Sequence, residues 1–588
     1  MDKMVLDTIN SPKDLKNLSI KELDVLANEI RQVLIKKMSI CGGHLGSNLG
    51  VVEATIALHY VFNSPVDKIV FDVSHQSYVH KILTGRKAAY LDNDSKWRVT
   101  GFTCPTESVH DFFSIGHTST SISLACGLAR ARDLKGDKEN IIAFIGDGAL
   151  SGGLAFEGLN VGGEMNTNLI VVVNDNNMAI AEPHGATTLH LSQLRESKGN
   201  AKDNFFRSLG YEYIFVEGGN CIEQLIEAFY SVKDTSRPVV VHICTQKGKG
   251  YSFAEDNCEG WHYHVPFDIE TGKKKSAGMG ENYGFTVRDF LLKKMEKDSS
   301  ICVVTPAVPM SCGFNAEIRQ KLGKQFIDVG IAEEHAVTMA AGIAKNGGKP
   351  IIVSLSTFYQ RTYDQILHDL CINKSPATLL VRNGSIWGDR DETHLGFFDI
   401  AMMSNIPNLV YLAPTNCEEY LAMLDWSIEQ NEYPVAIRIP SNKLVHIDKP
   451  VAKDYSNLNK SLVVKKGEKI ALFALGDFFQ MGEEFAIAIE KEFGFTPTLV
   501  NPRFISGLDT NLLEELQAKH NIIITLEDGI IEGGFGQKIA SYYGNSTMKV
   551  INCGLRKEFV NGCKTNELLE SNGLTSFQII NMLKGIVK

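Results

Sequence analysis

The stretch FIGDGALSGGLAFEGLNVGGEMNTNLIVVVNDNNMAI, residues 144–180, decides the fold of this chain. An apolar strand runs into Gly-Asp-Gly, a small-residue segment of helical length follows, and a second apolar strand ends in Asn-Asp-Asn-Asn. Asp147 and Asn176 are 29 positions apart, which suits a strand, a crossover helix and an adjacent parallel strand. Because ligands of open parallel sheets bind outside the carboxyl ends of the strands, we expect both side chains at one crevice.

The residue types at these two strand ends indicate a metal and a diphosphate. Carboxylate and amide oxygens suit Mg²⁺, which keeps few protein ligands and completes its octahedron with phosphate oxygens. Gly146 and Gly148 would let backbone amides approach a diphosphate. A lone Gly-Asp-Gly is most often a turn, so the prediction depends on its pairing with Asn176.

The rest of the chain repeats this alternation of strands and helices. Residues 19–39 have apolar residues at helical spacing, with Ser19 and Glu22 placed as a capping box. The strands are apolar throughout, which is typical of parallel sheets covered on both faces. The predicted strands lie at residues 68–74, 141–148, 169–175, 238–245, 325–331, 350–356, 377–383, 409–414, 434–440, 469–476, 496–505, 521–528 and 548–554.

The domain prediction follows from the length and from two polar passages. A chain of 588 residues exceeds what one hydrophobic core supports. Polar segments at 268–282 and 446–461 separate the strand-rich parts. We therefore expect an α/β protein of three consecutive open domains with mainly parallel sheets, at residues 1–275, 280–445 and 460–588.

Composition excludes several classes of protein. Hydrophobic residues make up 44% and charged residues 22% of the chain, as in an ordinary globular enzyme. The net charge is −10 and the basic residues are scattered, so we expect no nucleic-acid partner. Neither a signal-peptide core nor a stretch of ~18 apolar residues is present, so we expect a cytoplasmic protein without a membrane partner. The 12 cysteines form no CxxC pair, which indicates reduced thiols.

The order of several motifs resembles the 1-deoxy-D-xylulose-5-phosphate synthase family, whose members are transketolase-like enzymes. The resemblance implies thiamine diphosphate and Mg²⁺ as cofactors and a homodimer with the cofactor at a domain junction. It implies condensation of pyruvate, which loses CO₂, with glyceraldehyde 3-phosphate to give 1-deoxy-D-xylulose 5-phosphate, as in isoprenoid and thiamine precursor synthesis. The similar segments lie at 11–35, 42–65, 71–86, 115–123, 145–149, 246–251, 331–344, 356–369 and 393–399.

The same resemblance assigns roles to residues of this chain. Asp147 and Asn176 are similar to metal ligands of the family, with the Met178 carbonyl as a third. Glu333 is similar to the acid that contacts the pyrimidine of the cofactor; burial behind an apolar strand would raise its pKa and favour proton exchange. Its neighbour Glu334 is the competing choice, and acids at a helix start are also common without a catalytic role. The implied cofactor-binding residues are His75, His117, Gly146, Asp147, Gly148, Ala149, Asn176, Met178, Lys247, Phe358 and His262.

Three further residues are expected to act on the substrates. For His44 and His394 we favour proton transfer at the reacting carbonyl, because imidazole titrates nearest to neutral pH. Arg361 would offer a forked donor to a carboxylate or phosphate, although a surface salt bridge is the alternative. Lys247 is a weaker candidate for the cofactor site, because lysines beside glycine are often only solvated. Together with Glu333, these residues form the predicted catalytic set.

The acceptor side departs from the family pattern. Leu355 replaces a tyrosine, and Asn383 and Ser441 replace two arginines. Losing two charge-assisted contacts of ~1.5–3 kcal/mol each would weaken binding of a phosphorylated aldehyde. Two other hypotheses stay open: a paralogue with the same carboligase or transketolase-type mechanism and another, unphosphorylated acceptor, and an idle or regulatory binding protein. The arginines that could substitute are Arg382, Arg390 and Arg438.

Overall fold

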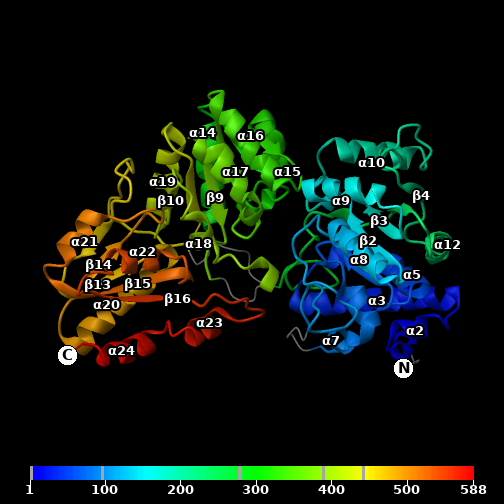
Figure 1. Ribbon diagram of the computed structural model, residues 1–588, viewed down its shortest axis with the longest axis horizontal. Helices are drawn as coiled ribbons and strands as arrows, with labels where there is room; N and C mark the ends of the chain where they lie inside the picture. The colour runs from blue at the N-terminus through cyan, green and yellow to red at the C-terminus, as the bar shows by residue number, and fades with distance from the viewer. Residues whose placement is uncertain (1–3, 94–98, 276–280, 387–390, 440–443, 588) are drawn as a thin grey trace. The chain divides into compact units, whose positions relative to one another are not determined.

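The computed structural model describes residues 4–93, 99–275, 281–386, 391–439 and 444–587. It divides into two compact units, Met1–Gly278 with Gly330–Ala332, and Met279–Val329 with Glu333–Lys588. Within the described residues, the first unit contains one sheet and the second contains two (Figure 1). The predicted series of three α/β layers with mainly parallel sheets is confirmed.

The sheet of the first unit is entirely parallel, with the strand order β1-β2-β3-β5-β4. Gly146 at the end of β2 pairs with Asn174 at the end of β3, so the two strand ends of the opening stretch are neighbours. The five strands are β1 Lys68–Phe71, β2 Ile141–Gly146, β3 Leu169–Asp175, β4 Glu212–Val216 and β5 Pro238–Cys244.

Two separate apolar clusters cover the faces of this sheet. Ile142 and Phe144 of β2 belong to the cluster with α3, α5 and α12, whereas Ala143 and Ile145 belong to the cluster with α8 and α9. Successive residues of one strand therefore enter opposite cores, which explains why the strands are apolar throughout. The long helices of the unit are α3 Ile20–Cys41, α5 Val52–Val61, α8 Ser121–Lys135, α9 Gly153–Glu164, α10 Ala186–Glu196 and α12 Ile222–Val232.

Short helices complete the first unit, and α3 begins as predicted. The Ser19 Oγ accepts from the Glu22 amide, and the Glu22 carboxylate accepts from the Ser19 amide at 2.8 Å. The predicted capping box is thus confirmed. The short helices are α1 Val5–Thr8, α2 Pro12–Leu15, α4 Leu45–Gly50, α6 Tyr78–Lys81, α7 Ala88–Leu91, α11 Phe205–Ser208 and α13 Ser252–Asp256.

The first sheet of the second unit has six parallel strands in the order β10-β11-β9-β8-β6-β7. Helices α14 and α19 pack on one face and α16 on the other. The strands are β6 Ile301–Thr305, β7 Phe326–Asp328, β8 Lys349–Leu355, β9 Thr378–Arg382, β10 Val410–Leu412 and β11 Val435–Ile439. The helices are α14 Tyr283–Met295, α15 Ala316–Leu322, α16 Glu333–Lys345, α17 Tyr363–Gln365, α18 Asp399–Met403 and α19 Cys417–Glu429.

The second sheet of this unit has the order β12-β14-β13-β15-β16, and its edge strand β12 is antiparallel to β14. One face shares a single apolar core with the six-stranded sheet, in which Ile352 and Leu379 lie in the same cluster as Phe473 and Ile523. The strands are β12 Leu462–Lys465, β13 Lys469–Ala474, β14 Thr498–Asn501, β15 His520–Ile530 and β16 Lys549–Leu555. The helices are α20 Phe479–Phe493, α21 Thr510–Leu516, α22 Phe535–Tyr542, α23 Thr565–Ser571 and α24 Ser576–Lys584.

Both polar passages that suggested linkers are partly folded. Phe267 is buried and forms an antiparallel bridge with Lys274, so the chain turns tightly here instead of leaving the first unit. In the second passage Tyr455 is buried and its ring packs against Trp426. Single aromatic residues thus fix segments that are otherwise polar. No helix among the described residues is long and apolar enough to cross a membrane.

Candidate cofactor and metal site

The ends of β2 and β3 are joined through Asp147. Its backbone amide donates to the Asn174 carbonyl at 3.0 Å, which continues the pairing of the two strands. Its carboxylate accepts from the Gly148 amide at 2.9 Å and from the Met178 amide at 3.1 Å. One buried acid therefore organises both loops that border the predicted crevice in the first unit.

The oxygen atoms at this crevice fit a cation. The Asn176 Oδ1 is buried and accepts no hydrogen bond from any described residue, which is costly unless a ligand compensates it. Burial, and then the nearby Asp175 carboxylate, raise the pKa of Asp147. Although burial opposes it, hydrogen bonds from His242 and Arg195 hold the pKa of Asp175 below its usual value. Asp147 and Asn176 are thus the oxygen ligands left for a hard divalent ion such as Mg²⁺.

The space beside this crevice suits a close approach by a diphosphate. A Cβ added to Gly148 would lie 2.8 Å from the Ala179 Cβ, whereas one added to Gly146 meets no atom of the described chain within 4 Å. Lys247 is buried and its Nζ donates to the Ala179 carbonyl at 2.6 Å. Burial lowers the pKa of Lys247 to about 8, against the opposing effect of Asp147. Lys247 is therefore not a solvated surface lysine.

Three of the predicted histidines form one cluster in the first unit. The ring centroids of His44 and His75 are 5.1 Å apart, those of His44 and His262 5.5 Å, and those of His75 and His262 5.1 Å. Burial, and then His75 and Lys247, hold the pKa of His44 well below its usual value. The pKa of His262 is likewise well below the usual value, through burial, Lys247 and the other two rings. Both imidazoles are neutral at pH 7.

Asn48 positions two of these histidines, and sequence reasoning did not single it out. Its buried Nδ2 donates to the backbone carbonyls of His44 and His75, each at 2.8 Å. Its Oδ1 accepts from the Tyr78 amide at 2.9 Å. A polar residue within the otherwise small and apolar helix α4 is the signal that could have identified it.

His117 lies on a loop that is fixed to the end of β1. The buried Asp72 carboxylate follows β1 and accepts from the Ser119 amide at 2.7 Å and the Ser121 amide at 2.9 Å. Asp72 also precedes His75 by three residues. One carboxylate therefore connects the loops of both predicted phosphate-contacting histidines.

In the second unit, Glu333 is the first residue of α16 and is 5% exposed. Burial raises the pKa of Glu333 to about 7, against the opposing effect of the Arg361 guanidinium. An Arg361 Nη1 lies 3.6 Å from the Glu333 Oε2. The neighbouring Glu334 is less buried. Burial therefore favours Glu333 over Glu334 as a proton-exchanging acid.

Phe358 and His394 come together in the same unit, with ring centroids 5.8 Å apart in an edge-to-face arrangement. The Thr393 hydroxyl donates to Asp391 at 2.8 Å and lies 2.9 Å from the His394 Nδ1. Because that hydroxyl has one proton, the Nδ1 of His394 must donate to it. In the neutral ring, the Nε2 of His394 is then the nitrogen with a lone pair.

On the acceptor side, Arg438 is not available for a substrate phosphate. It is buried, its Nε donates to Asp399 at 2.8 Å, and its Nη1 donates to Asp528. Leu355 ends β8, and Asn383 follows β9 with a left-handed φ of 57°. The uncharged Asn383 does not replace the charge of an arginine. Of the candidate substitutes, Arg390 lies outside the described residues, as does the altered position Ser441.

Comparison with known families agrees with this architecture. Residues 120–300 match the thiamine diphosphate binding domain of transketolase, 282–445 match its pyrimidine binding domain and 459–579 match its C-terminal domain. The parallel sheets and these matches define a transketolase-type enzyme that uses thiamine diphosphate. Residues 6–202 also match the family model described as 1-deoxy-D-xylulose-5-phosphate synthase.

Whole-length relatives bear the same name. The enzyme named 1-deoxy-D-xylulose-5-phosphate synthase from Caldanaerobacter subterraneus subsp. tengcongensis is 40% identical, over 98% of each chain. The enzymes of that name from Alkaliphilus oremlandii and Clostridium botulinum are 39% and 38% identical, over 98% and 99% of each chain. The chain belongs to the 1-deoxy-D-xylulose-5-phosphate synthase family.

Proposed function

We propose that this protein condenses pyruvate, with loss of CO₂, with glyceraldehyde 3-phosphate to form 1-deoxy-D-xylulose 5-phosphate. The observation that carries the proposal is the buried Asn176 Oδ1 without a hydrogen bond, together with the buried Asp147 carboxylate of raised pKa, at adjacent strand ends of a chain that matches this family over its length. Family membership over 98% of the chain favours this activity over a paralogue with another acceptor.

Residues of the first unit bind the diphosphate end of the cofactor. Asp147, Asn176 and the Met178 carbonyl hold Mg²⁺, which neutralises the diphosphate charge. The backbone from Gly146 to Ala149 approaches the phosphate oxygens because Gly146 leaves the space for it. Lys247, His75, His117 and His262 surround the same end of the cofactor.

Residues of the second unit act on the aminopyrimidine end. Thiamine diphosphate, when bound, supplies a nucleophilic carbon that stores the electron pair released with CO₂. Glu333 shares a proton with a ring nitrogen of the pyrimidine, and its pKa of about 7 lets it populate both protonation states near neutrality. Phe358 stacks on the pyrimidine face. Glu333 is therefore the group that moves a proton on and off the cofactor.

The histidines transfer protons at the substrate oxygens. His44 is neutral and so can hydrogen-bond a reacting carbonyl without adding a charge. His394 presents the lone pair of Nε2, because its Nδ1 donates to Thr393. Arg361 and Arg382 bind the anionic groups of the substrates, since Arg438 is occupied by two carboxylates.

The test is turnover of the purified protein with thiamine diphosphate, Mg²⁺ and pyruvate, with and without glyceraldehyde 3-phosphate. We expect CO₂ release that depends on the aldehyde and formation of deoxyxylulose phosphate. CO₂ release without that product would favour the paralogue, and a failure to bind the cofactor would favour a regulatory protein.

Arg382→Gln should raise KM for the phosphorylated aldehyde at least ~10-fold, for the loss of a charged contact. Arg288→Gln, a matched change at an arginine that pairs with its neighbour Asp289, should leave KM unchanged.

The proposal also covers assembly and cellular role. The protein acts as a cytoplasmic homodimer, and its product enters isoprenoid and thiamine precursor synthesis. The support is resemblance to the family. Analytical ultracentrifugation of the cofactor-loaded protein should give twice the mass of one chain, and a monomer with full activity would contradict the dimer.

A further inference from the structure

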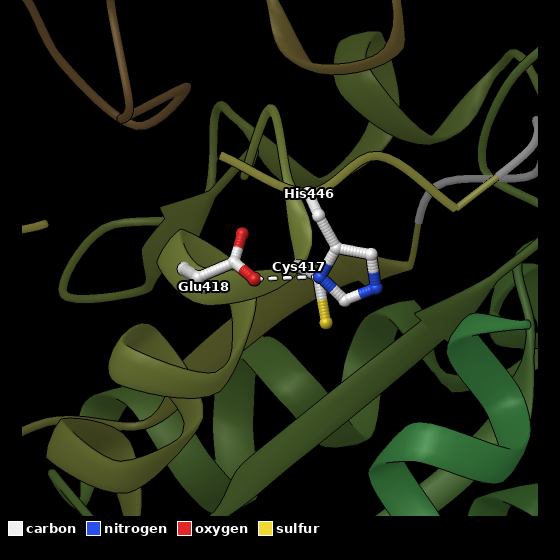
Figure 2. Close-up of side chains that lie close together, drawn as sticks. All are labelled: Cys417, Glu418 and His446. Carbon is white, nitrogen blue, oxygen red and sulfur yellow. Dashed lines mark hydrogen bonds and ion pairs between the residues drawn. The ribbon is translucent and has the colours of Figure 1, made fainter. Parts of the chain in front are cut away.

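A cysteine, a glutamate and a histidine that have no role in the function proposed above lie together in the second unit (Figure 2). Cys417 and Glu418 begin α19, and His446 lies on the segment after β11. One ligand atom of each residue lies within 4.8 Å of the others. We propose that these three side chains bind a zinc ion.

The backbone positions these ligands before any ion binds. The Cys417 amide donates to the Val445 carbonyl at 2.8 Å, which fixes the start of α19 beside the segment that contains His446. One oxygen of Glu418 accepts from the Ile447 amide at 2.9 Å. The other oxygen of Glu418 therefore points to the His446 Nδ1, at 2.6 Å (Figure 2).

The chemistry of the set selects the metal. Thiolate, imidazole and carboxylate are the ligands that Zn²⁺ takes in proteins, whereas Mg²⁺ prefers oxygen alone. Bonds of ~2.0–2.3 Å place tetrahedral zinc ligands roughly 3.3–3.8 Å apart, so a small opening of the 2.6 Å contact between the Glu418 Oε1 and the His446 Nδ1 would let both bind one ion. Three protein ligands leave a fourth position for water. A sequence motif could not reveal this site, because 28 residues separate Glu418 from His446.

A second carboxylate completes the arrangement. The Oε2 of Glu281 lies 3.6 Å from the His446 Nε2, on the opposite side of the ring from Nδ1. A metal-bound histidine usually donates its other N–H to a carboxylate or carbonyl, which fixes the ring and strengthens the ligand. Cys417 is 2% exposed, whereas the His446 side chain is 52% exposed. An ion can therefore enter from solvent and reach the buried sulfur.

Without an ion, the contact between His446 and Glu418 is an exposed ion pair, worth about 0–1 kcal/mol. Such an ion pair does not explain why the buried sulfur of Cys417 lies beside it. With the ion, the same contacts fasten residues 444–447 to the start of α19. The site is structural in this sense and independent of the cofactor, whose proposed metal is bound through oxygen in the first unit.

The test is a spectroscopic titration with Co²⁺ of the full-length protein after removal of metals by a chelator. Excess Mg²⁺ is present so that the oxygen site is occupied. We expect one Co²⁺ per chain with a sulfur-to-cobalt charge-transfer band, and loss of the band when Zn²⁺ is added. Cys417→Ser should abolish the band, whereas Cys563→Ser, at a half-buried free thiol of the same unit, should retain it.

Two variants at exposed positions protect the test against a folding defect. His446→Gln should weaken Co²⁺ binding at least ~10-fold, and Glu281→Gln about 10-fold through loss of the carboxylate beside the His446 Nε2. Absence of a sulfur band in the unaltered protein, or a band unchanged in Cys417→Ser or His446→Gln, would overturn the zinc site. The readout requires no turnover, so a failure of the proposed enzymatic function would leave this result unaffected.

Discussion

At the scale of single residues, burial raises the pKa of two acids of the candidate site, Asp147 and Glu333. Asp147 lies at a strand end beside Asn176, whose buried oxygen also needs a partner. Glu333 starts a helix, where burial raises its pKa although the Arg361 guanidinium at 3.6 Å opposes this effect. The ion pair of Asp111 with Arg86 behaves differently, because the pKa of Asp111 falls below the usual range despite burial. Unpaired acids of this kind cluster at functional sites.

Glu333→Gln should reduce kcat by ~10²–10⁴, the usual contribution of general acid–base catalysis, with binding of the diphosphate end retained.

The pKa of Glu333 is about 7 in the folded protein, against an ordinary value of 4.5 for glutamate. Its favourable contribution is therefore present below pH 4.5 and is lost as pH rises through 7. Relative to the parent protein, the variant should gain roughly 3 kcal/mol at pH 8 compared with pH 4.5. Urea denaturation of the cofactor-free proteins at both pH values measures this difference.

Glu334→Gln is the matched control for that experiment, since it changes the adjacent acid of the same helix turn. It should leave both turnover and the pH dependence of unfolding close to those of the parent. If Glu334→Gln abolished turnover and Glu333→Gln did not, the two roles would be exchanged.

Asn48→Ala should lower kcat/KM by ~10- to 100-fold, because both histidine backbones lose their shared donor and small misplacements at a reacting centre are costly. The two carbonyls also stay buried without that donor, at a cost of about 1–3 kcal/mol in the free energy of unfolding. Steady-state kinetics and urea denaturation measure the two effects. Loss of stability with unchanged kinetics would make Asn48 purely structural.

At the scale of elements, the ends of β2 and β3 explain how a common sheet becomes a binding site. Both strands are apolar until their carboxyl ends, and polar side chains follow only there. The backbone of Gly148 packs against Ala179, whereas the Cα hydrogen of Gly146 faces open space. Gly148 is thus required by the packing of the protein itself, and Gly146 leaves room for a ligand.

This difference predicts opposite behaviour for two alanine substitutions. Gly148→Ala should lower the free energy of unfolding of the cofactor-free protein by ~1–3 kcal/mol, because its methyl group overlaps Ala179. Gly146→Ala should change that free energy by less than ~0.5 kcal/mol but weaken the stabilisation by thiamine diphosphate with Mg²⁺. Thermal unfolding with and without the cofactor compares them. Equal cofactor-induced shifts in Gly146→Ala and the parent would place the diphosphate elsewhere.

Sequence reasoning succeeded for elements whose signal is local. The buried parallel strands were predictable because both faces enter a core, and α3 because its cap lies within four residues. The strands β4, β6 and β12 were missed, and β12 pairs antiparallel at an exposed edge. The pairing of Arg438 was beyond prediction because its partners are distant in sequence, whereas Asn48 had only an indirect signal as a polar residue in α4. The roles of the predicted cofactor and catalytic residues remain predictions.

At the scale of the whole molecule, a buried ion network joins the two sheets of the second unit. Arg438 of β11 contacts Asp399 at the start of α18 and Asp528 of β15, and the Tyr411 hydroxyl donates to Asp399. Burial raises the pKa of Asp399, although Arg438 opposes this effect. The network is satisfied only while both sheets stay in place.

Arg438→Met should destabilise the protein by about 3–5 kcal/mol, because it leaves two buried carboxylates without a cation. Adding Asp399→Asn and Asp528→Asn to that variant should recover part of the loss. Urea denaturation of the three proteins measures the effect. An unchanged KM for the aldehyde in any folded variant is also expected, whereas a large increase would return Arg438 to the acceptor site.

The shared core of the six-stranded sheet and the C-terminal sheet also bears on how this gene can be divided. A break near residue 279 separates two bodies, apart from residues 330–332, and no apolar cluster of the described residues extends across that break. A break near residue 460 would instead remove the residues that pack on Phe473 and Ile523 and expose an apolar face of the C-terminal sheet to water. Two polypeptides divided near residue 279 should therefore fold and remain in solution, whereas two polypeptides divided near residue 460 should aggregate.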